Sequence, residues 1–76
     1  MKELVEVMAK ALVDNPDEVS VSERDETGET IVELRVAASD MGKVIGRQGR
    51  IAKAIRAVVN AASAKTDQKV VVDIVQ

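Results

Sequence analysis

The sequence contains no Cys, His, Phe, Trp or Tyr, and it has one Pro and four Gly in 76 residues. Without Cys there is no disulfide, no thiolate metal site and no thiol nucleophile, and without His the usual general base is missing. A core without aromatic rings must be built from Val, Ile, Leu, Met and Ala. We therefore expect a single domain, residues 1–76, that is not an enzyme and uses no cofactor.

Long apolar runs are also missing. Lys2, Glu3, Glu6 and Lys10 interrupt the first segment, so we expect neither a signal peptide nor a membrane span. Together with the absence of Cys, this pattern predicts a cytoplasmic protein with no membrane partner.

The charges are divided unevenly along the chain. The formal net charge is −2, but residues 1–40 sum to −7 and residues 41–76 to +5. A weakly acidic chain argues against nucleic acid as a partner only if the charge is spread evenly, because the local field decides binding. The second half is therefore the place to look for an anionic ligand.

The first forty residues have the pattern of a helix followed by a hairpin. Apolar residues at spacings of three and four predict a helix over 2–14, whose expected buried face is Leu4, Val5, Met8, Ala11 and Leu12. Alternation predicts a strand over 18–24, with Val19 and Val21 on one side. A turn at 25–28 leads to a second strand over 30–37, in which Val32, Leu34 and Val36 face inward.

The second half predicts two helices and a strand. A short helix capped by Ser39 or Asp40 ends near Ile45, and a longer one runs from Arg50 to about 64, with Ile51, Ile55, Val58, Val59 and Ala62 in one stripe. A loop at 65–69 precedes a last strand over 70–75, inner or parallel. The order α-β-β-α-α-β predicts an α+β fold, a three-stranded mixed sheet with the helices on one face.

The stretch V-I-G-R-Q-G-R-I at 44–51 interrupts this helical region with two glycines three residues apart. Each glycine costs roughly 1 kcal/mol relative to Ala in a helix, so bare backbone must serve a purpose there. A turn at Gly46–Gly49 opens a helix N-terminus whose free amides favour an anion. Cations surround this turn, and Val44, Ile45, Ile51 and Ile55 are expected to form an apolar floor beside it.

The glycines have other possible interpretations. Glycines often serve only as helix C-caps in a tight turn. Gly42, Gly46 and Gly49 form G-x₃-G-x₂-G, which is neither the dinucleotide fingerprint nor a Walker loop. The apolar pair before the turn, the helix after it and seven basic residues in this half favour a ligand site over a plain cap.

I-G-R-Q-G at 45–49 resembles the G-x-x-G loop of KH domains, which clamps four nucleotides by their backbone. The predicted order of helices and strands resembles the type II KH fold. L-V-D-N-P-D-E-V at 12–19 and D-M-G-K-V-I-G-R-Q-G-R-I-A-K-A-I-R at 40–56 are similar to the small single-KH bacterial RNA-binding proteins of the KhpA family, also called YlqC. The resemblance covers nearly the whole chain.

This resemblance implies a set of roles. The expected RNA-binding residues are Lys43, Val44, Ile45, Gly46, Arg47, Gln48, Gly49, Arg50 and Lys53, and Lys65 and Lys69 of the following loop would add phosphate contacts. One departure is Ala52, where KH domains commonly carry a bulky aliphatic residue. The family implies single-stranded RNA as ligand, self-association, a larger KH-containing partner protein, and a regulatory or RNA-chaperone role.

Two other functions stay open from the residues alone. A protein-interaction module with little RNA binding would use apolar residues on the second face of the sheet, namely Ile31, Val71 and Val75. A phosphate-binding enzyme lacks any recognisable catalytic group. The acidic residues around the hairpin turn, Glu23, Asp25, Glu26 and Glu29, do not have the EF-hand spacing and are expected to be solvated.

Overall fold

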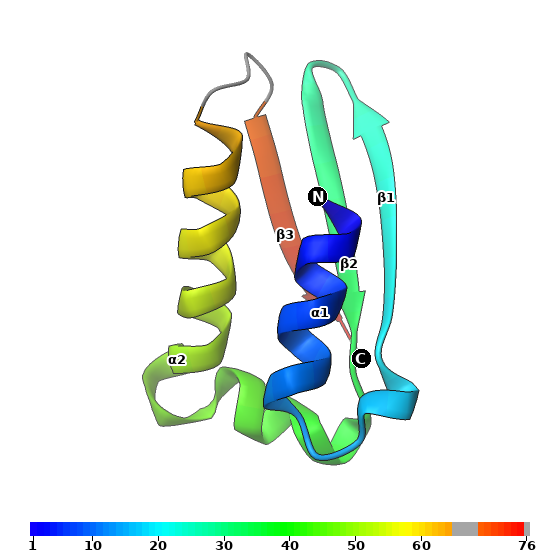
Figure 1. The fold of residues 1–76 in the computed structure, drawn as a ribbon, viewed down its shortest axis with the longest axis vertical. Helices are drawn as coiled ribbons and strands as arrows, with labels where there is room; N and C mark the ends of the chain where they lie inside the picture. The colour runs from blue at the N-terminus through cyan, green and yellow to red at the C-terminus, as the bar shows by residue number, and fades with distance from the viewer. Residues whose placement is uncertain (65–68, 76) are drawn as a thin grey trace.

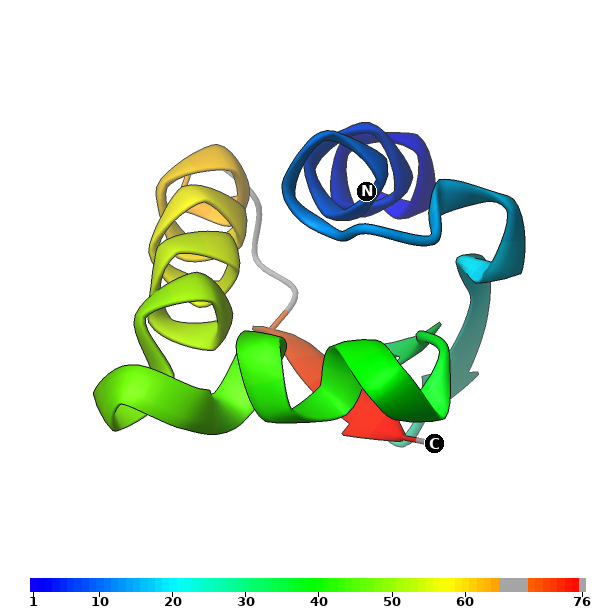
Figure 2. The same ribbon diagram turned by 90° about the horizontal axis from the view of Figure 1, so that it is seen from below.

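The computed structural model describes residues 1–64 and 69–75, with only the backbone at Arg47. Its elements are α1 (Lys2–Leu12), the 3₁₀ turn η1 (Pro16–Glu18), β1 (Ser20–Glu26), β2 (Glu29–Arg35), α2 (Ala38–Ser63) and β3 (Lys69–Val75). The sheet has the order β1-β2-β3; β1 pairs antiparallel and β3 parallel with the central β2. This is the predicted α+β fold with a mixed sheet, and Figures 1 and 2 show α1 and the end of α2 on one face of it.

Helix α1 is shorter than predicted and is turned differently. It ends at Leu12, before the Asn15-Pro16 stop. Val5 and Ala9 are its buried residues, whereas Leu12 is 38% exposed and Ala11 is exposed, so the predicted face is only partly right. Ala9, which the prediction left out, faces the core at 1% exposure, and Leu12 faces solvent instead.

The hairpin confirms the predicted alternation and corrects its turn. The β1–β2 register pairs Glu26 with Glu29, which leaves a turn of two residues, Thr27 and Gly28. Both have positive φ, 28° and 80°, as a type I′ hairpin turn requires. Both strands therefore extend closer to the turn than expected. At their far ends they are shorter than expected, because β1 begins only at Ser20 and β2 ends already at Arg35.

Helix α2 bends sharply near its middle, as Figures 1 and 2 show. Gln48 and Gly49 have φ of 64° and 69°, and two left-handed residues in succession cannot continue a right-handed helix. We call residues 38–47 the first arm and residues 50–63 the second arm. The two predicted helices are these arms, but the break between them is narrower than the expected gap after Ile45, because only Gln48 and Gly49 have positive φ within α2.

The core lies between the sheet and the helices. Its fully buried side chains include Val5, Val32, Leu34, Val44, Ile55 and Val59. The predicted stripe on the second arm is rotated: Ala52 is buried in place of Val58, which is 39% exposed, and Ala62 is exposed. β3 is parallel, as one alternative expected, but it is an edge strand. Val72, at 6% exposure, is its one buried residue. No helix within the described ranges is both long and apolar enough to cross a membrane.

Candidate nucleic-acid interface

The two glycines of the bend have different reasons to be glycine. Gly49 has φ of +69°, in the left-handed region that residues with a Cβ rarely adopt, so the fold itself favours glycine there. Gly46 has no positive φ, and a Cβ built on it would meet no atom within 4 Å. The sequence favoured a ligand site over a plain helix cap for both glycines, and at Gly49 the backbone conformation supplies a structural reason as well. At Gly46 the fold gives no reason for a bare backbone.

A cavity of about 520 Å³ lies at the bend, which we call the bend pocket. Its lining residues are Gly42, Lys43, Gly46, Arg50 and Ile51. The bend brings the two arms together, so that Lys43 and Gly46 of the first arm meet Arg50 of the second. Three residues predicted for the site thus line one cavity, and the part of its lining that the structure describes includes two cations and two positions that have no side chain.

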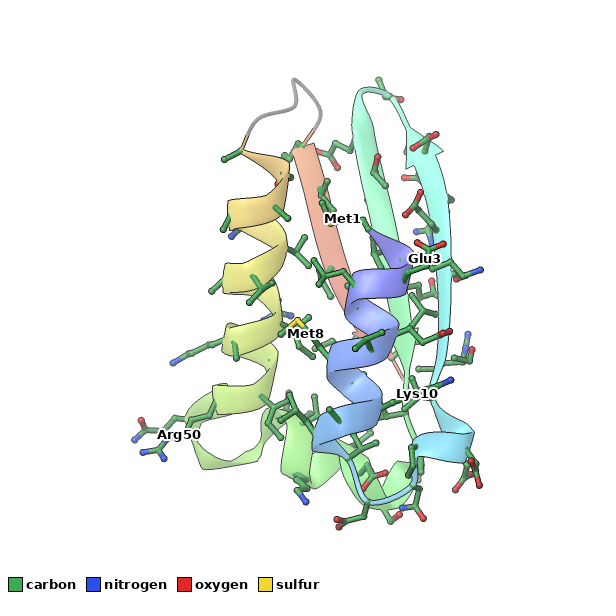
Figure 3. The ribbon with its side chains drawn as sticks, in the orientation of Figure 1. Met1, Glu3, Met8, Lys10 and Arg50 are labelled. Atoms are coloured by element: carbon green, nitrogen blue, oxygen red, sulfur yellow. The ribbon has the colours of Figure 1, made fainter. Side chains whose placement is uncertain are left out.

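Arg50 carries its charge at the outer side of the bend. The side chain is exposed, and Figure 3 shows it pointing away from the body of the molecule. Lys53, one turn further along the second arm, is exposed as well, as is Gln48 in the bend. The side chain of Arg47 and the whole of Lys65 lie outside what the structure describes. Lys69 is the first residue of β3, and its Nζ forms an ion pair with Oε1 of Glu29 at 3.8 Å.

The apolar floor differs from its prediction. Val44 is 1% exposed and Ile55 fully buried, so their side chains belong to the core and not to a ligand-facing surface. Ile45 is 53% exposed and Ile51 is partly buried against the core. The departure at Ala52 also falls in the core, at 2% exposure. Ile45 and Ile51 are therefore the apolar side chains that remain available beside the bend.

The start of α2 is fixed by Asp40, which is 1% exposed. The prediction that Ser39 or Asp40 caps this helix is wrong. The N-cap residue is Ala37, and no side chain forms a capping hydrogen bond there. The Asp40 carboxylate instead accepts hydrogen bonds from the backbone amides of Asp14 (3.2 Å) and Asn15 (3.0 Å) and from Asn15 Nδ2 (3.1 Å). These bonds tie the connection after α1 to the first arm.

Burial by itself raises the pKa of Asp40, because it disfavours the charged form. The hydrogen bonds from the Asn15 side chain and from the amides of Asp14 and Asn15, together with the charge of Lys43, outweigh this effect. The pKa of Asp40 consequently lies below the usual value for an aspartate. The carboxylate stays ionised at neutral pH, one helical turn before Lys43.

Lys43 is held from the same connection. Its Nζ lies 3.0 Å from Oδ1 of Asp14, in an ion pair whose partners are both well exposed to solvent. Lys43 therefore lines the bend pocket while its charge is partly compensated by a carboxylate 29 residues earlier in the chain. No sequence pattern predicted this contact, which depends on the way α1 leads into η1.

A smaller cavity of about 170 Å³ lies between the second arm and the edge strand β3. It is lined by Arg56, Asn60, Val70, Val71 and Val72. Asn60 was not among the predicted site residues. Its spacing from Lys53 and Arg56 places these three residues on one side of the second arm, which is the pattern that would have identified it.

A family model described as "KhpA/KhpB, KH domain" matches residues 2–74. The chain belongs to this family. The resemblance inferred from the G-R-Q-G loop and its flanking sequence is thereby confirmed, and the bent helix α2 is the part of this KH domain that carries the loop.

Curated relatives agree with this assignment over their full length. The RNA-binding protein KhpA of Clostridium acetobutylicum is 60% identical over 75 residues, which cover 99% of this chain and 100% of the relative. The RNA-binding protein KhpA of Aquifex aeolicus is 45% identical over 76 residues, covering 100% of this chain and 96% of the relative. No solved structure matches the chain significantly.

Proposed function

We propose that this chain binds single-stranded RNA, with the phosphate backbone seated in the bend pocket. The observation that carries the proposal is the lining of that pocket, where Gly46 leaves bare backbone beside Lys43 and Arg50. A sugar-phosphate chain can approach closely where no Cβ projects, and two cations there compensate its charge. The names of the relatives support RNA as the polyanion.

The electrostatic field of α2 supports a polyanionic ligand. From residue 41 to residue 63 the sequence has no acidic residue and five basic ones, which are Lys43, Arg47, Arg50, Lys53 and Arg56. Contacts from such residues to phosphates position a nucleic acid without reading its sequence. We therefore infer a binding mode in which phosphate contacts supply most of the affinity.

The bases have an apolar surface beside the phosphates. Ile45 is more than half exposed, and Ile51 lies at the edge of the bend pocket. Because the chain has no aromatic residue, it cannot stack bases on rings, an interaction worth about 1–3 kcal/mol per base elsewhere. We expect weak, sequence-tolerant binding per domain, which joining two domains would strengthen by avidity.

The decisive variant is Gly46→Asp. It places a carboxylate in the bend pocket at a position where the fold leaves open space, so we expect a native circular dichroism spectrum and the loss of RNA binding. The matched control is Ser20→Asp, which adds the same charge on the exposed face of β1 opposite Arg35. Binding of a fluorescent single-stranded RNA, followed by anisotropy, compares the two.

The two variants separate a local effect from a general one. If Ser20→Asp weakens binding as much as Gly46→Asp, net charge and not the pocket controls affinity. If Gly46→Asp binds like the wild type, the assignment of the pocket is wrong. Gly46→Ala, which adds only a methyl group, then shows whether close backbone approach or charge is the sensitive quantity.

The cellular role follows from the family resemblance. We propose a regulatory or RNA-chaperone function in the cytoplasm, exercised together with a larger KH-containing protein. Crosslinking this chain to RNA in living cells, then sequencing the retained RNA and identifying co-purified proteins, tests both parts. Recovery of no RNA above that retained by Gly46→Asp would contradict the role.

A second candidate function is protein association, and exposed apolar residues favour it. Val7 on α1 is 67% exposed, and Leu12 on α1 and Val58 on α2 are nearly 40% exposed. The two helices stand side by side in Figures 1 and 2, and Met8 points from α1 toward α2 in Figure 3. Ile31 of the predicted sheet-face patch is buried, so the helices offer the larger apolar surface.

We propose a second copy of this chain as the occupant of that surface. Sedimentation at micromolar concentration should then give a mass above the 8.1 kDa of one chain. Val7→Asp and Val58→Asp should return the protein to a monomer, whereas Ser20→Asp on the sheet should not. A wild type that sediments as a monomer at high concentration would contradict self-association.

A further inference from the structure

The contact between Asp14 and Lys43 has a consequence for the bend pocket. Lys43 is one of the cations that line it, yet in the ligand-free protein its Nζ lies 3.0 Å from a carboxylate oxygen of Asp14. A phosphate that takes this cation must replace the carboxylate. The chain thus carries an internal competitor for a group that its proposed ligand needs.

The position of Asp14 is fixed by the fold. Its backbone amide donates to buried Asp40 at 3.2 Å, and the next residue, Asn15, bonds to the same carboxylate through its amide and its side chain. Asn15 Nδ2 also donates to Ser39 at 3.1 Å. These bonds involve the backbone of residue 14 and not its carboxylate, so the fold places that carboxylate beside Lys43 without using it elsewhere in the described chain.

The strength of the contact allows exchange. Asp14 and Lys43 keep 74% and 45% of their side-chain surfaces exposed, and ion pairs in such positions contribute little free energy because water screens them. In the free protein the Asp14 carboxylate contacts Lys43 directly, and the ionised carboxylate of Asp40 adds a weaker attraction from one helical turn away. An RNA backbone, which presents several phosphates to Lys43 and Arg50 together, gains more than it loses by displacing Asp14.

We propose that Asp14 is a positioning residue that acts through Lys43 and sets the threshold for ligand binding at the bend pocket. It withholds Lys43 from isolated anions and releases it to a chain of phosphates. The inference rests on the proposed RNA binding, and it names a residue outside the G-R-Q-G loop that lowers affinity.

The test is Asp14→Asn, measured against Asp17→Asn. Both remove one exposed acidic charge from the same connection, but no ion pair joins Asp17 to Lys43. We expect Asp14→Asn to tighten binding of a single-stranded RNA by about threefold, as expected for a weak exposed ion pair, and Asp17→Asn to change it by less than half as much. The salt dependence of RNA affinity should also be steeper for Asp14→Asn than for the wild type, by at most about 0.7 in the logarithmic slope. In this variant Lys43 no longer has to exchange the Asp14 carboxylate for an RNA phosphate.

A double-mutant cycle isolates the coupling. In a Lys43→Ala background, Asp14→Asn should give no more than the effect of Asp17→Asn, because the contact through which it acts is gone. The proposal would be overturned if Asp14→Asn and Asp17→Asn raised RNA affinity equally. It would also be overturned if Asp14→Asn gave its full gain in affinity in the Lys43→Ala background. A loss of affinity in Asp14→Asn would overturn it as well, because Asp14 would then orient Lys43 for the ligand.

The Gly46→Asp and Asp14→Asn variants distinguish a failure of the proposed RNA binding from a failure of the proposed role of Asp14. If wild type and Gly46→Asp bind RNA equally, the bend pocket is not the site and both proposals fail. If Gly46→Asp loses binding while Asp14→Asn leaves affinity and salt dependence unchanged, RNA binding stands and the role of Asp14 is rejected. Thermal denaturation of each variant confirms that a folded protein is compared.

Discussion

The buried carboxylate of Asp40 accepts hydrogen bonds from both the backbone and the side chain of Asn15, 25 residues away in the sequence. This relationship joins the end of α1 to the beginning of α2. It does so next to the only Pro in the chain, Pro16, which begins η1. The same connection carries Asp14, so the Asp40–Asn15 contact determines how Asp14 faces Lys43.

The first prediction concerns stability and pH. Asp40→Asn replaces one acceptor oxygen by an amide group that faces the N–H donors of residues 14 and 15, and it should lower the melting temperature at pH 7 by about 5 °C or more. Because the pKa of Asp40 is depressed in the folded state, its ionised form stabilises the fold above the usual aspartate value of 3.8. This contribution is lost as the pH falls through the lower folded pKa.

The melting temperatures of wild type and Asp40→Asn should therefore converge as the pH is lowered from 7 to below 3.8. Asp17→Asn serves as the control, because it removes an exposed charge from η1 and should shift the melting temperature little at either pH. A difference between the melting temperatures of wild type and Asp40→Asn that does not narrow as the pH falls below 3.8 would mean that the charge of Asp40 does not contribute.

The second prediction separates the two glycines of the bend. Gly49→Ala forces a residue with a Cβ to φ of +69°, which costs about 1–2 kcal/mol. Gly46→Ala meets no atom within 4 Å and should stabilise the helix by about 0.5–1 kcal/mol. Urea denaturation measures both, and anisotropy should show that Gly46→Ala binds RNA less tightly although it is more stable. Equal effects of the two substitutions on stability would contradict this division.

The sequence predicted the elements that depend on local patterns. Alternation placed Val32 and Leu34 in the core, and Gly28 marked the hairpin turn. Prediction from the sequence failed where packing between elements decides which residue is buried. Leu12 fits the apolar pattern of α1 as well as Ala9 does, and only contact with the neighbouring elements selects the smaller residue.

The candidate site shows the same division. The spacing of Gly46 and Gly49 located the bend, but not the rotation of the first arm, which buries Val44 and exposes Ile45. Asp40 had a sufficient local explanation as a helix cap. Its partners lie across the fold, and no local pattern announces a hydrogen bond to a loop 25 residues earlier.

The last prediction tests the electrostatic basis of binding. If three or four phosphates are neutralised on α2, the logarithm of RNA affinity should fall with the logarithm of salt concentration with a slope of roughly −2 to −3, at about 0.7 per phosphate. Arg50→Ala removes a cation that lines the bend pocket. It should flatten the slope by somewhat under one and weaken binding to all RNA sequences alike, because a phosphate contact does not read bases.

Lys10→Ala is the control for this series. Lys10 belongs to α1 and pairs with Glu6 at 3.8 Å, so its removal changes the net charge equally but should leave the slope unchanged. Titrations at several salt concentrations provide the slopes for all three proteins. A wild-type slope near zero, or equal changes from Arg50→Ala and Lys10→Ala, would mean that the separation of charge between the two halves of the chain serves solubility and not RNA binding.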